Sequence, residues 1–444
     1  MPDLDYRQAI EALLAYADFE RSGRFADRPD VAPVLALLSR LGDPHLGRVT
    51  VHITGSKGKG SVAAMVESVL RQAGLRTGLY TSPHLDSYCE RVRIDGQPIS
   101  EEEFSRHAAD VLAAAEAVMP SLPGRQLVTF DLLTAIGFLA FRQHRVQVQV
   151  VEVGLGGRVD STNVLPRKEA SVITPISLEH TAILGDTPAA IAREKAAIVR
   201  PPGPLVLAPQ GYAEAKEVCL QAAAAAGVET VDVAVRYRWR VLERDIDGQR
   251  FRLEWEGGSL EARLPLLGTH QVENAATAVA VAHSLARQGL PVDGEAIARG
   301  LAKVAWPGRL EVLSRDPLVV ADGAHNGDSA RRLRQALEEH FAAQGVVLVV
   351  GTLADKDIVG MARELAPIAA AVIAAPFDHP RAMPADRVAS AFAEAGCTVY
   401  QARSAEDALG RALAISGGRA LICLTGSLAF VAEGRRPLLA KRAR

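Results

Sequence analysis

The segment Arg48–Ala73, RVTVHITGSKGKGSVAAMVESVLRQA, determines the fold of this 444-residue chain. Its first part is a short apolar run that ends at Gly55, which is typical of a buried strand. From Ser61 the apolar residues recur with helical spacing, and the pattern stops before Gly74, a residue type that commonly follows a helix. A glycine-rich turn, GSKGKGS, joins the two stretches. The order strand, glycine-rich turn, helix is what a phosphate-binding loop requires.

In this loop, phosphate would be bound by Gly55, Gly58, Lys59, Gly60 and Ser61. Glycines let the backbone N–H groups point inward, a lysine reaches the outer phosphates, and a hydroxyl approaches Mg²⁺. The spacing departs from G-x-x-x-x-G-K-[ST] because a glycine separates Lys59 from Ser61. The alternative is an ordinary glycine-rich turn. Two of the chain's eight lysines lie in these seven residues, which favours phosphate binding.

Outward from this segment, strand-like and helix-like stretches alternate, which favours βαβ units and a parallel sheet. Strands are expected at 77–81, 146–153 and 171–176, and helices at 100–119, 130–145 and 188–199. Residues 237–266 are rich in β-formers, with Asp247-Gly248 as a hairpin signal, so we expect a small antiparallel flap there.

After a hinge-like segment at 305–309, a second alternation of strands and helices begins. The predicted fold class is therefore α/β, with a phosphate-loop parallel-sheet N-terminal domain that carries the flap and a smaller Rossmann-like α/β C-terminal domain. The predicted domains are residues 1–304 and 305–444.

Composition excludes several classes of protein. Fifty basic and fifty-two acidic residues give a formal charge of −2, so we expect no nucleic acid as the main partner. No apolar run is long enough to span a membrane, and the N-terminal stretch lacks the features of an export signal. Four scattered cysteines indicate reduced thiols. We expect a cytoplasmic monomer that acts on small molecules.

Further polar residues follow predicted strands. Ser82, Glu152 and His180 would meet in one crevice, because the carboxyl ends of parallel strands share one edge of a sheet. Together they could hold a divalent cation, although each alone is an ordinary loop residue. Lys195 lies on a helix rich in Ala and Ile, where a lysine is most often a surface residue with a buried stem.

The sequence DGAHN at 322–326 follows an apolar strand and precedes a helix, which suggests a site. The alternative is that Asn326 or Asp328 caps the helix. Arg309, in the hinge-like segment, could clamp phosphate or form an ion pair between the domains.

These motifs, in this order, resemble those of the folylpolyglutamate synthase/dihydrofolate synthase family within the Mur ligase superfamily. The resemblance covers roughly positions 45 to 330 and is looser towards the end. The matching stretches are HITGSKGKGS, GLYTSPHL, ERVRIDGQPIS, VEVGLGGRVDSTNV, ITPISLEHTAILGDTPAAIAREKAAIV, GTHQVENAATAVA, WPGRLEVL and DGAHNGDSA, then Lys356-Asp357, HPRAMP and TGSL at 425–428.

The resemblance implies an ATP-dependent, ADP-forming ligase that phosphorylates a carboxylate of a pteroate or folate and joins it to L-glutamate. The implied catalytic residues are Lys59, Lys195 and His325. The implied ligands of two Mg²⁺ ions are Ser82, Glu152, His180 and a carbamylated Lys195. Besides the loop, the implied ATP contacts are Asn274, Arg309 and Asp322. The implied substrate contacts are Thr129, Phe130, Asp131, Val159, Asp160 and Ser161.

Three positions depart from the family pattern. Lys57 replaces an asparagine, Asp131 replaces a glutamate, and Ala432-Glu433 stands where a glycine-glutamate pair is usual. Two other functions remain as alternatives. A Mur-type ligase for another acid would be expected to carry a nucleotide-sugar-binding domain before the loop, where this chain has 54 residues. A nucleotide-binding regulator would not need Glu152, His180, Lys195 and His325.

Overall fold

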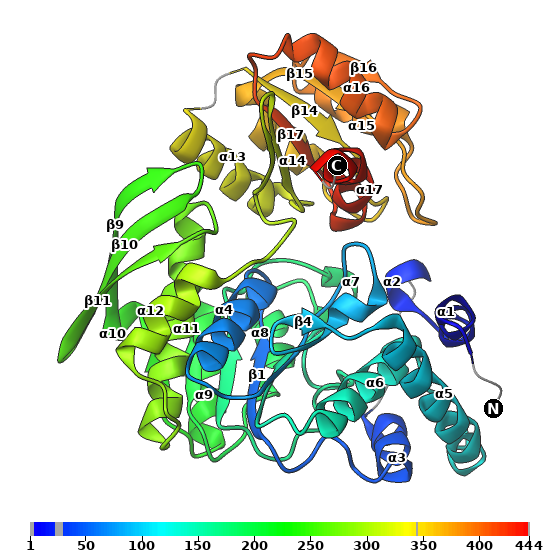
Figure 1. Ribbon diagram of the computed structural model, residues 1–444, viewed down its shortest axis with the longest axis vertical. Helices are drawn as coiled ribbons and strands as arrows, with labels where there is room; N and C mark the ends of the chain where they lie inside the picture. Colours follow the sequence, from blue (N-terminus) through cyan, green and yellow to red (C-terminus); the bar gives the residue numbers. More distant parts are fainter. Residues whose placement is uncertain (1–3, 23–29, 343–344, 443–444) are drawn as a thin grey trace.

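A computed structural model describes residues 4–22, 30–342 and 345–442. The chain forms two lobes, each built on its own sheet, with the C-terminal lobe above the N-terminal lobe in Figure 1. We call the part before residue 305 the N-terminal lobe and the part from residue 305 the C-terminal lobe. None of the helices in the described ranges combines the length and apolar character that a membrane span requires.

The N-terminal lobe contains an eight-stranded sheet in the order β4-β3-β2-β5-β1-β6-β7-β8. Strands β2, β5, β1, β6, β7 and β8 are parallel, and β3 and β4 are antiparallel to their neighbours. Their bounds are β1 (Val49–Thr54), β2 (Thr77–Tyr80), β3 (Val92–Ile94), β4 (Gln97–Pro98), β5 (Val148–Glu152), β6 (Ala170–Ile173), β7 (Leu205–Leu207) and β8 (Thr230–Asp232).

Strand β1 lies in the centre of this sheet, between β5 and β6. Val51 and Ile53 are fully buried, as expected for an apolar strand covered on both faces. One face packs against α4 (Lys59–Gln72), α11 (Thr269–Arg287) and α12 (Gly294–Lys303). On the other side a second core gathers α1 (Tyr6–Leu14), α3 (Ala32–Arg40), α5 (Glu101–Val118) and α6 (Thr129–Gln143). Helices α8 (Pro188–Ala196) and α9 (Ala213–Ala225) form a smaller core with β6 and β7.

The antiparallel flap consists of β9 (Tyr237–Asp245), β10 (Gly248–Trp255) and β11 (Gly258–Leu264). Its buried Phe251 and Leu253 join the core beneath α11 and α12. The tip between β9 and β10 reaches the C-terminal lobe (Figure 1). There the His340 ring donates to the Asp245 carbonyl over 3.1 Å and accepts from the Gly268 N–H over 2.9 Å.

The C-terminal lobe has a six-stranded sheet in the order β12-β13-β17-β14-β15-β16, parallel except for the β12–β13 pair. Helices α13 (Gly327–Phe341), α14 (Ile358–Leu365) and α15 (Ala385–Glu394) pack in one core, and α16 (Ala405–Ser416) and α17 (Leu428–Arg442) in the other. The strands are β12 (Glu311–Arg315), β13 (Leu318–Asp322), β14 (Val346–Val350), β15 (Ala369–Ala374), β16 (Val399–Gln401) and β17 (Ile422–Thr425).

The predicted fold class is confirmed: two mostly parallel sheets, with a small antiparallel flap on the N-terminal lobe. Some boundaries were wrong. The helix expected at 188–199 ends at Ala196, and the strand expected at 171–176 ends at Ile173. The predicted domain boundary at 304/305 falls between α12 and β12, and it stays a prediction.

Helix α12 packs against α4 through Gly300, and this contact yields a stability prediction. A Cβ on Gly300 would lie 2.4 Å from the Val69 Cα, so Gly300→Ala must push the two helices apart. We expect a loss of about 1–3 kcal/mol in the free energy of unfolding, measured by urea denaturation. The matched control is Gly410→Ala in α16, where nothing lies within 4 Å of the new Cβ. That variant should gain about 0.5–1 kcal/mol, because alanine is the better helix former. Equal effects of the two substitutions would refute the described packing.

Candidate active site

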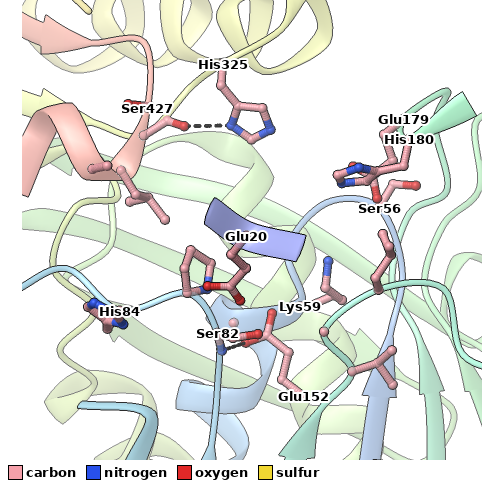
Figure 2. A pocket seen from close by; sticks show the side chains of 18 of the residues that line it. Glu20, Ser56, Lys59, Ser82, His84, Glu152, Glu179, His180, His325 and Ser427 are labelled. Atoms are coloured by element: carbon pink, nitrogen blue, oxygen red, sulfur yellow. Dashed lines mark hydrogen bonds between the residues drawn. The ribbon is translucent and has the colours of Figure 1, made fainter. Parts of the chain in front are cut away.

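A cavity of about 650 Å³ lies between the lobes, at the carboxyl ends of β1, β2, β5 and β13. Residues of both lobes line it, among them Lys59 and Glu152 from the N-terminal lobe and His325 and Lys356 from the C-terminal lobe. Figure 2 shows Lys59, Glu152 and His325 reaching the cavity from different elements. The carboxyl edge of a parallel sheet is where ligands bind in open α/β folds.

The glycine-rich loop joins β1 to α4, as predicted. Gly58 has φ +86°, and a Cβ there would lie 2.4 Å from the Asn274 Oδ1. Gly55 has φ +146°, and its Cβ would overlap the Thr174 side chain. Only glycine fits either position, because both need an unusual φ and a close approach. The Lys59 Nζ donates to the Gly55 carbonyl over 3.1 Å, so the side chain folds back over the loop.

Glu179 connects two lysines beside this loop. Its Oε1 lies 3.5 Å from the Lys195 Nζ and its Oε2 lies 3.4 Å from the Lys57 Nζ. Burial alone would raise the pKa of Glu179, but the Lys195 and Lys57 ammonium groups outweigh burial and hold it well below its usual range. The Lys195 Nζ also donates to the Gly55 carbonyl over 2.8 Å. Lys195 is therefore a buried site residue and not the surface residue that its helix suggested.

Burial lowers the pKa of Lys195 to about 8, although Glu179 acts in the opposite direction. Burial also lowers the pKa of Lys57, and Lys59 lowers it further. A lysine with a lowered pKa has a larger fraction of neutral amine near neutral pH. Neutral amine is the form that reacts with electrophiles.

The predicted metal ligands form two groups. Glu152 accepts a hydrogen bond from the Ser82 N–H over 3.2 Å, and burial raises the pKa of its carboxyl. His180 lies with Glu179, and Lys59 lies between the two groups in the view of Figure 2. Burial lowers the pKa of His180 to about 4, so its ring is neutral at pH 7. The described residues contain no group of three or more His, Cys, Asp and Glu side chains placed to hold a metal ion.

Four predicted residues line the cavity near the hinge: Asn274, Arg309, Asp322 and His325. Asp322 already accepts the backbone N–H groups of Leu310 at 2.8 Å and Ala324 at 2.9 Å, so it shapes the loops around the hinge. The His325 ring donates from Nδ1 to the Gly323 carbonyl over 2.9 Å, and burial lowers its pKa to about 3. Asn326 caps α13, which confirms the alternative that this residue caps the helix. The neighbouring His325 lines the cavity.

The predicted substrate residues lie on the α6 start and the loop after β5. Thr129, Phe130, Val159, Asp160 and Ser161 line the cavity. Asp131 does not: it is fully buried, accepts the Val128 N–H at the start of α6, and accepts from the Ser161 hydroxyl over 2.6 Å. Gly55 is likewise absent from the lining. Asp131 therefore lies behind the cavity wall and holds the Ser161 side chain, which does line the cavity.

Several cavity residues were missed by the sequence analysis, notably Glu20, Arg91, Glu179, His270 and Lys356. Glu179 directly precedes His180, and Arg91 lies inside the matching stretch ERVRIDG, so both had a signal in the sequence. Glu20, in the short helix α2 (Phe19–Ser22), had none, because no motif surrounds it.

Comparison with known families first defines the class of the protein. Residues 105–282 match the Mur ligase middle domain, and residues 308–428 match the Mur ligase, glutamate ligase domain. The chain therefore has the two domains of the Mur ligase superfamily.

Individual relatives define the family. The chain is 36% identical to the folylpolyglutamate synthase of Lacticaseibacillus casei, covering 94% of this chain and 96% of the relative. It is 39% identical to a probable bifunctional folylpolyglutamate synthase/dihydropteroate synthase of Haloferax volcanii, over 97% of this chain, and spans about half the length of that relative.

Solved structures agree. The structure of Mycobacterium tuberculosis folylpolyglutamate synthase complexed with ADP and AMPPCP superposes with a TM-score of 0.87 at 34% identity, covering 98% of this chain and 99% of that chain. An FPGS-AMPPCP-folate complex gives 0.84 at 32% identity, covering 98% and 100%. The chain belongs to the folylpolyglutamate synthase/dihydrofolate synthase family.

Lys57, which replaces the family's asparagine, yields a prediction. Its contact with Glu179 is almost buried, with 12% of the Lys57 side chain exposed, so salt screens it poorly. Lys57→Asn should weaken binding of a nonhydrolysable ATP analogue by roughly 3- to 10-fold, because one cation leaves the site. Titration calorimetry at low and high salt measures this, and we expect the loss to persist at high salt. Lys216→Asn, which breaks a surface pair with Asp232, should have no effect. Tighter binding by Lys57→Asn would contradict this assignment.

Proposed function

We propose that this protein is an ATP-dependent, ADP-forming ligase that joins L-glutamate to the carboxylate of a pteroate or folate. The observation that supports it most is the glycine-rich loop with Lys57 and Lys59 at the edge of a cavity between two lobes, to which Arg309 and Lys356 add positive charge from the C-terminal lobe. These four cations suit the negative charge of a triphosphate, and they do not include Lys195, which is proposed below as an anion. Membership of the family supports a pteroate or folate as the acid and L-glutamate as the amine.

The first chemical step makes the carboxylate reactive. A carboxylate oxygen attacks the γ-phosphorus, the bond to the β–γ bridging oxygen breaks, and ADP leaves. The product is an acyl phosphate. Lys59 and Arg309 neutralise charge on the phosphates, and closure of the lobes keeps water from the acyl phosphate.

The second step forms the amide. The neutral glutamate amine attacks the acyl carbon, the bond to the phosphate oxygen breaks and phosphate leaves, and the nitrogen gives up one proton and keeps the other as the amide N–H. His325 is suited to orient this amine. Because its Nδ1–H donates to the Gly323 carbonyl, Nε2 keeps a lone pair that accepts a hydrogen bond. The low pKa of His325 keeps the ring in this neutral form.

The donors in the cavity suit Mg²⁺, which commonly uses one or two carboxylates together with phosphate oxygens and water. Ser82 and Glu152 would hold one ion beside the outer phosphates, and His180 with Lys195 a second. Bound there, Mg²⁺ supplies neutralisation of phosphate charge. The raised pKa of Glu152 supports this fit, because a buried carboxylate gains most from a nearby cation.

Lys195 would serve as a carbamate. Its neutral amine adds to the carbon of CO₂, a C–N bond forms, and the nitrogen loses a proton, which leaves an anion. The lowered pKa of Lys195 favours the neutral amine that this reaction needs. Arginine cannot take part, because its guanidinium stays charged.

The remaining predictions are proposals of the same kind. We propose that the protein acts as a cytoplasmic monomer, with domains 1–304 and 305–444. The predicted contacts of Thr129, Phe130, Val159, Asp160 and Ser161 with the substrate belong here as well. Asp131 would act through Ser161, which accounts for its buried place.

Mass spectrometry of products tests the function directly. The enzyme is incubated with ATP, Mg²⁺, labelled L-glutamate and either dihydropteroate or tetrahydrofolate. We expect one labelled glutamate added per ADP formed with at least one of the two acids. ADP formation without a labelled product on either acid would point to a Mur-type ligase for another acid, and no ADP at all would refute the proposal.

Substitution of Lys195 tests the carbamate. We expect Lys195→Arg and Lys195→Ala each to lose at least about 10²-fold in kcat. Formate or acetate should partly rescue the alanine variant alone, because a small acid can replace the missing anion. In the wild type, ¹³C-labelled CO₂ should give a carbamate signal by NMR that both variants lack. An active Lys195→Arg enzyme, or no carbamate signal in active wild type, would overturn this role.

A further inference from the structure

Arg91 is a buried cation beside the cavity. Only 2% of its side chain is exposed, and it lies at the end of the 3₁₀ turn η1 (Tyr88–Arg91). Its Nε donates to the His84 Nδ1 over 2.9 Å, and its guanidinium lies 5.1 Å from the centre of the Tyr88 ring. These contacts fix the plane of the guanidinium and leave its two terminal nitrogens facing a partner.

That partner is Glu20. The Arg91 Nη1 donates to Oε1 over 3.1 Å and Nη2 donates to Oε2 over 2.5 Å, which is the two-pronged geometry of an arginine–carboxylate pair. Within the described residues, Glu20 is the only carboxylate that forms an ion pair with Arg91. The Glu20 side chain is 39% exposed, so it reaches Arg91 from the cavity and not from the core.

The position of Glu20 in the cavity is informative. Its carboxylate points towards the loop of Ser82, close to Glu152 in the view of Figure 2. Lys59 lines the same region. The Glu152 carboxyl interacts electrostatically with both Lys59 and Arg91, so the two cations lie near the same carboxyl group. In the proposed reaction, the carboxylate of the acid substrate has to come within reach of the γ-phosphate held by Lys59, and Arg91 lies on that side of the cavity.

Glu20 also connects the two lobes. Its backbone carbonyl accepts from the Arg381 Nη2 over 2.7 Å, and Arg381 pairs with Asp355 over 3.0 Å in the C-terminal lobe. Helix α2 is only four residues long and buries none of them. With 39% of its side chain exposed, Glu20 can turn its carboxylate away from Arg91 while the helix backbone stays in place.

We propose that Arg91 recognises the carboxylate of the acid substrate, and that Glu20 is an internal carboxylate that occupies Arg91 until the substrate displaces it. This inference rests on the proposed function. A buried guanidinium is costly without a counter-charge, so a group that replaces Glu20 must itself bring an anion. A planar carboxylate matches the arginine fork in both oxygens, and the substrate of a glutamate ligase carries one.

The alternative is that the Glu20–Arg91 pair is a permanent strap that holds the site together. The two hypotheses predict opposite changes in the affinity for substrate when the Glu20 carboxylate is removed. A displaced occupant lowers the apparent affinity for substrate, because only the fraction of molecules with a free Arg91 can bind. A permanent strap would raise that affinity, so its removal would weaken binding.

Equilibrium binding of dihydropteroate and its methyl ester, without nucleotide, separates them. Glu20→Ala should bind the acid roughly 10-fold more tightly than the wild type, with a smaller gain for the ester, because the ester lacks the anion that Arg91 pairs with. The substitution leaves the Glu20 backbone bond to Arg381 available. Glu11→Ala, which removes an exposed carboxylate paired with Arg7 on α1, is the matched control and should change neither affinity.

Arg91→Lys completes the test, because it keeps the charge and removes the fork. It should lose at least about 10-fold in affinity for the acid and little for the ester. Weaker acid binding by Glu20→Ala, or equal loss of acid and ester by Arg91→Lys, would overturn the proposal. Nucleotide-analogue binding and the thermal midpoint of each variant show that it is folded. Failure of the proposed function would appear separately, as no labelled product from the wild type.

Discussion

The Gly55 carbonyl is the atom on which the site depends most. It accepts from both the Lys59 Nζ and the Lys195 Nζ, at 3.1 and 2.8 Å. Both lysines can reach it because Gly55 has no side chain and the loop lies directly against Thr174. This close approach brings the end of β1 to the segment after β6, which carries Glu179 and His180. A side chain at Gly55 would separate the phosphate loop from every one of these groups.

The second constraint is charge. Glu179 pairs with Lys57 and Lys195 at once, while Lys59 turns to a backbone carbonyl. Lys57 and Lys59 both line the cavity at the glycine-rich loop, and these two ammonium groups favour a polyanion there. His325, which lies above Lys59 in Figure 2, and Lys356 line the cavity from the C-terminal lobe, so the site is complete only when both lobes are in place. Glu20 then links the lobes across the cavity mouth through Arg91 and Arg381.

The parts of this account that are local in sequence could be predicted. The phosphate loop, the strand ends and the flap hairpin follow from short patterns, and the structure confirms their fold. Pairings between distant residues could not be predicted. Nothing in the sequence indicates that Lys57 meets Glu179, or that Glu20 meets Arg91, since these contacts depend on how whole elements pack. The burial of Asp131 could not be predicted either: the residue was expected to contact substrate, and the structure places it fully buried at the start of α6, beneath Ser161.

The central claim is that Lys59 and the glycine-rich loop bind the outer phosphates of a nucleotide. Titration calorimetry of Lys59→Ala with a nonhydrolysable ATP analogue and with AMP tests this most directly. We predict that the variant, folded with an unchanged thermal midpoint, binds the triphosphate analogue at least about 10²-fold more weakly than the wild type. Its affinity for AMP should stay within a few-fold, because AMP lacks the outer phosphates. Wild-type affinity for the triphosphate, or an equal loss for both nucleotides, would contradict the account.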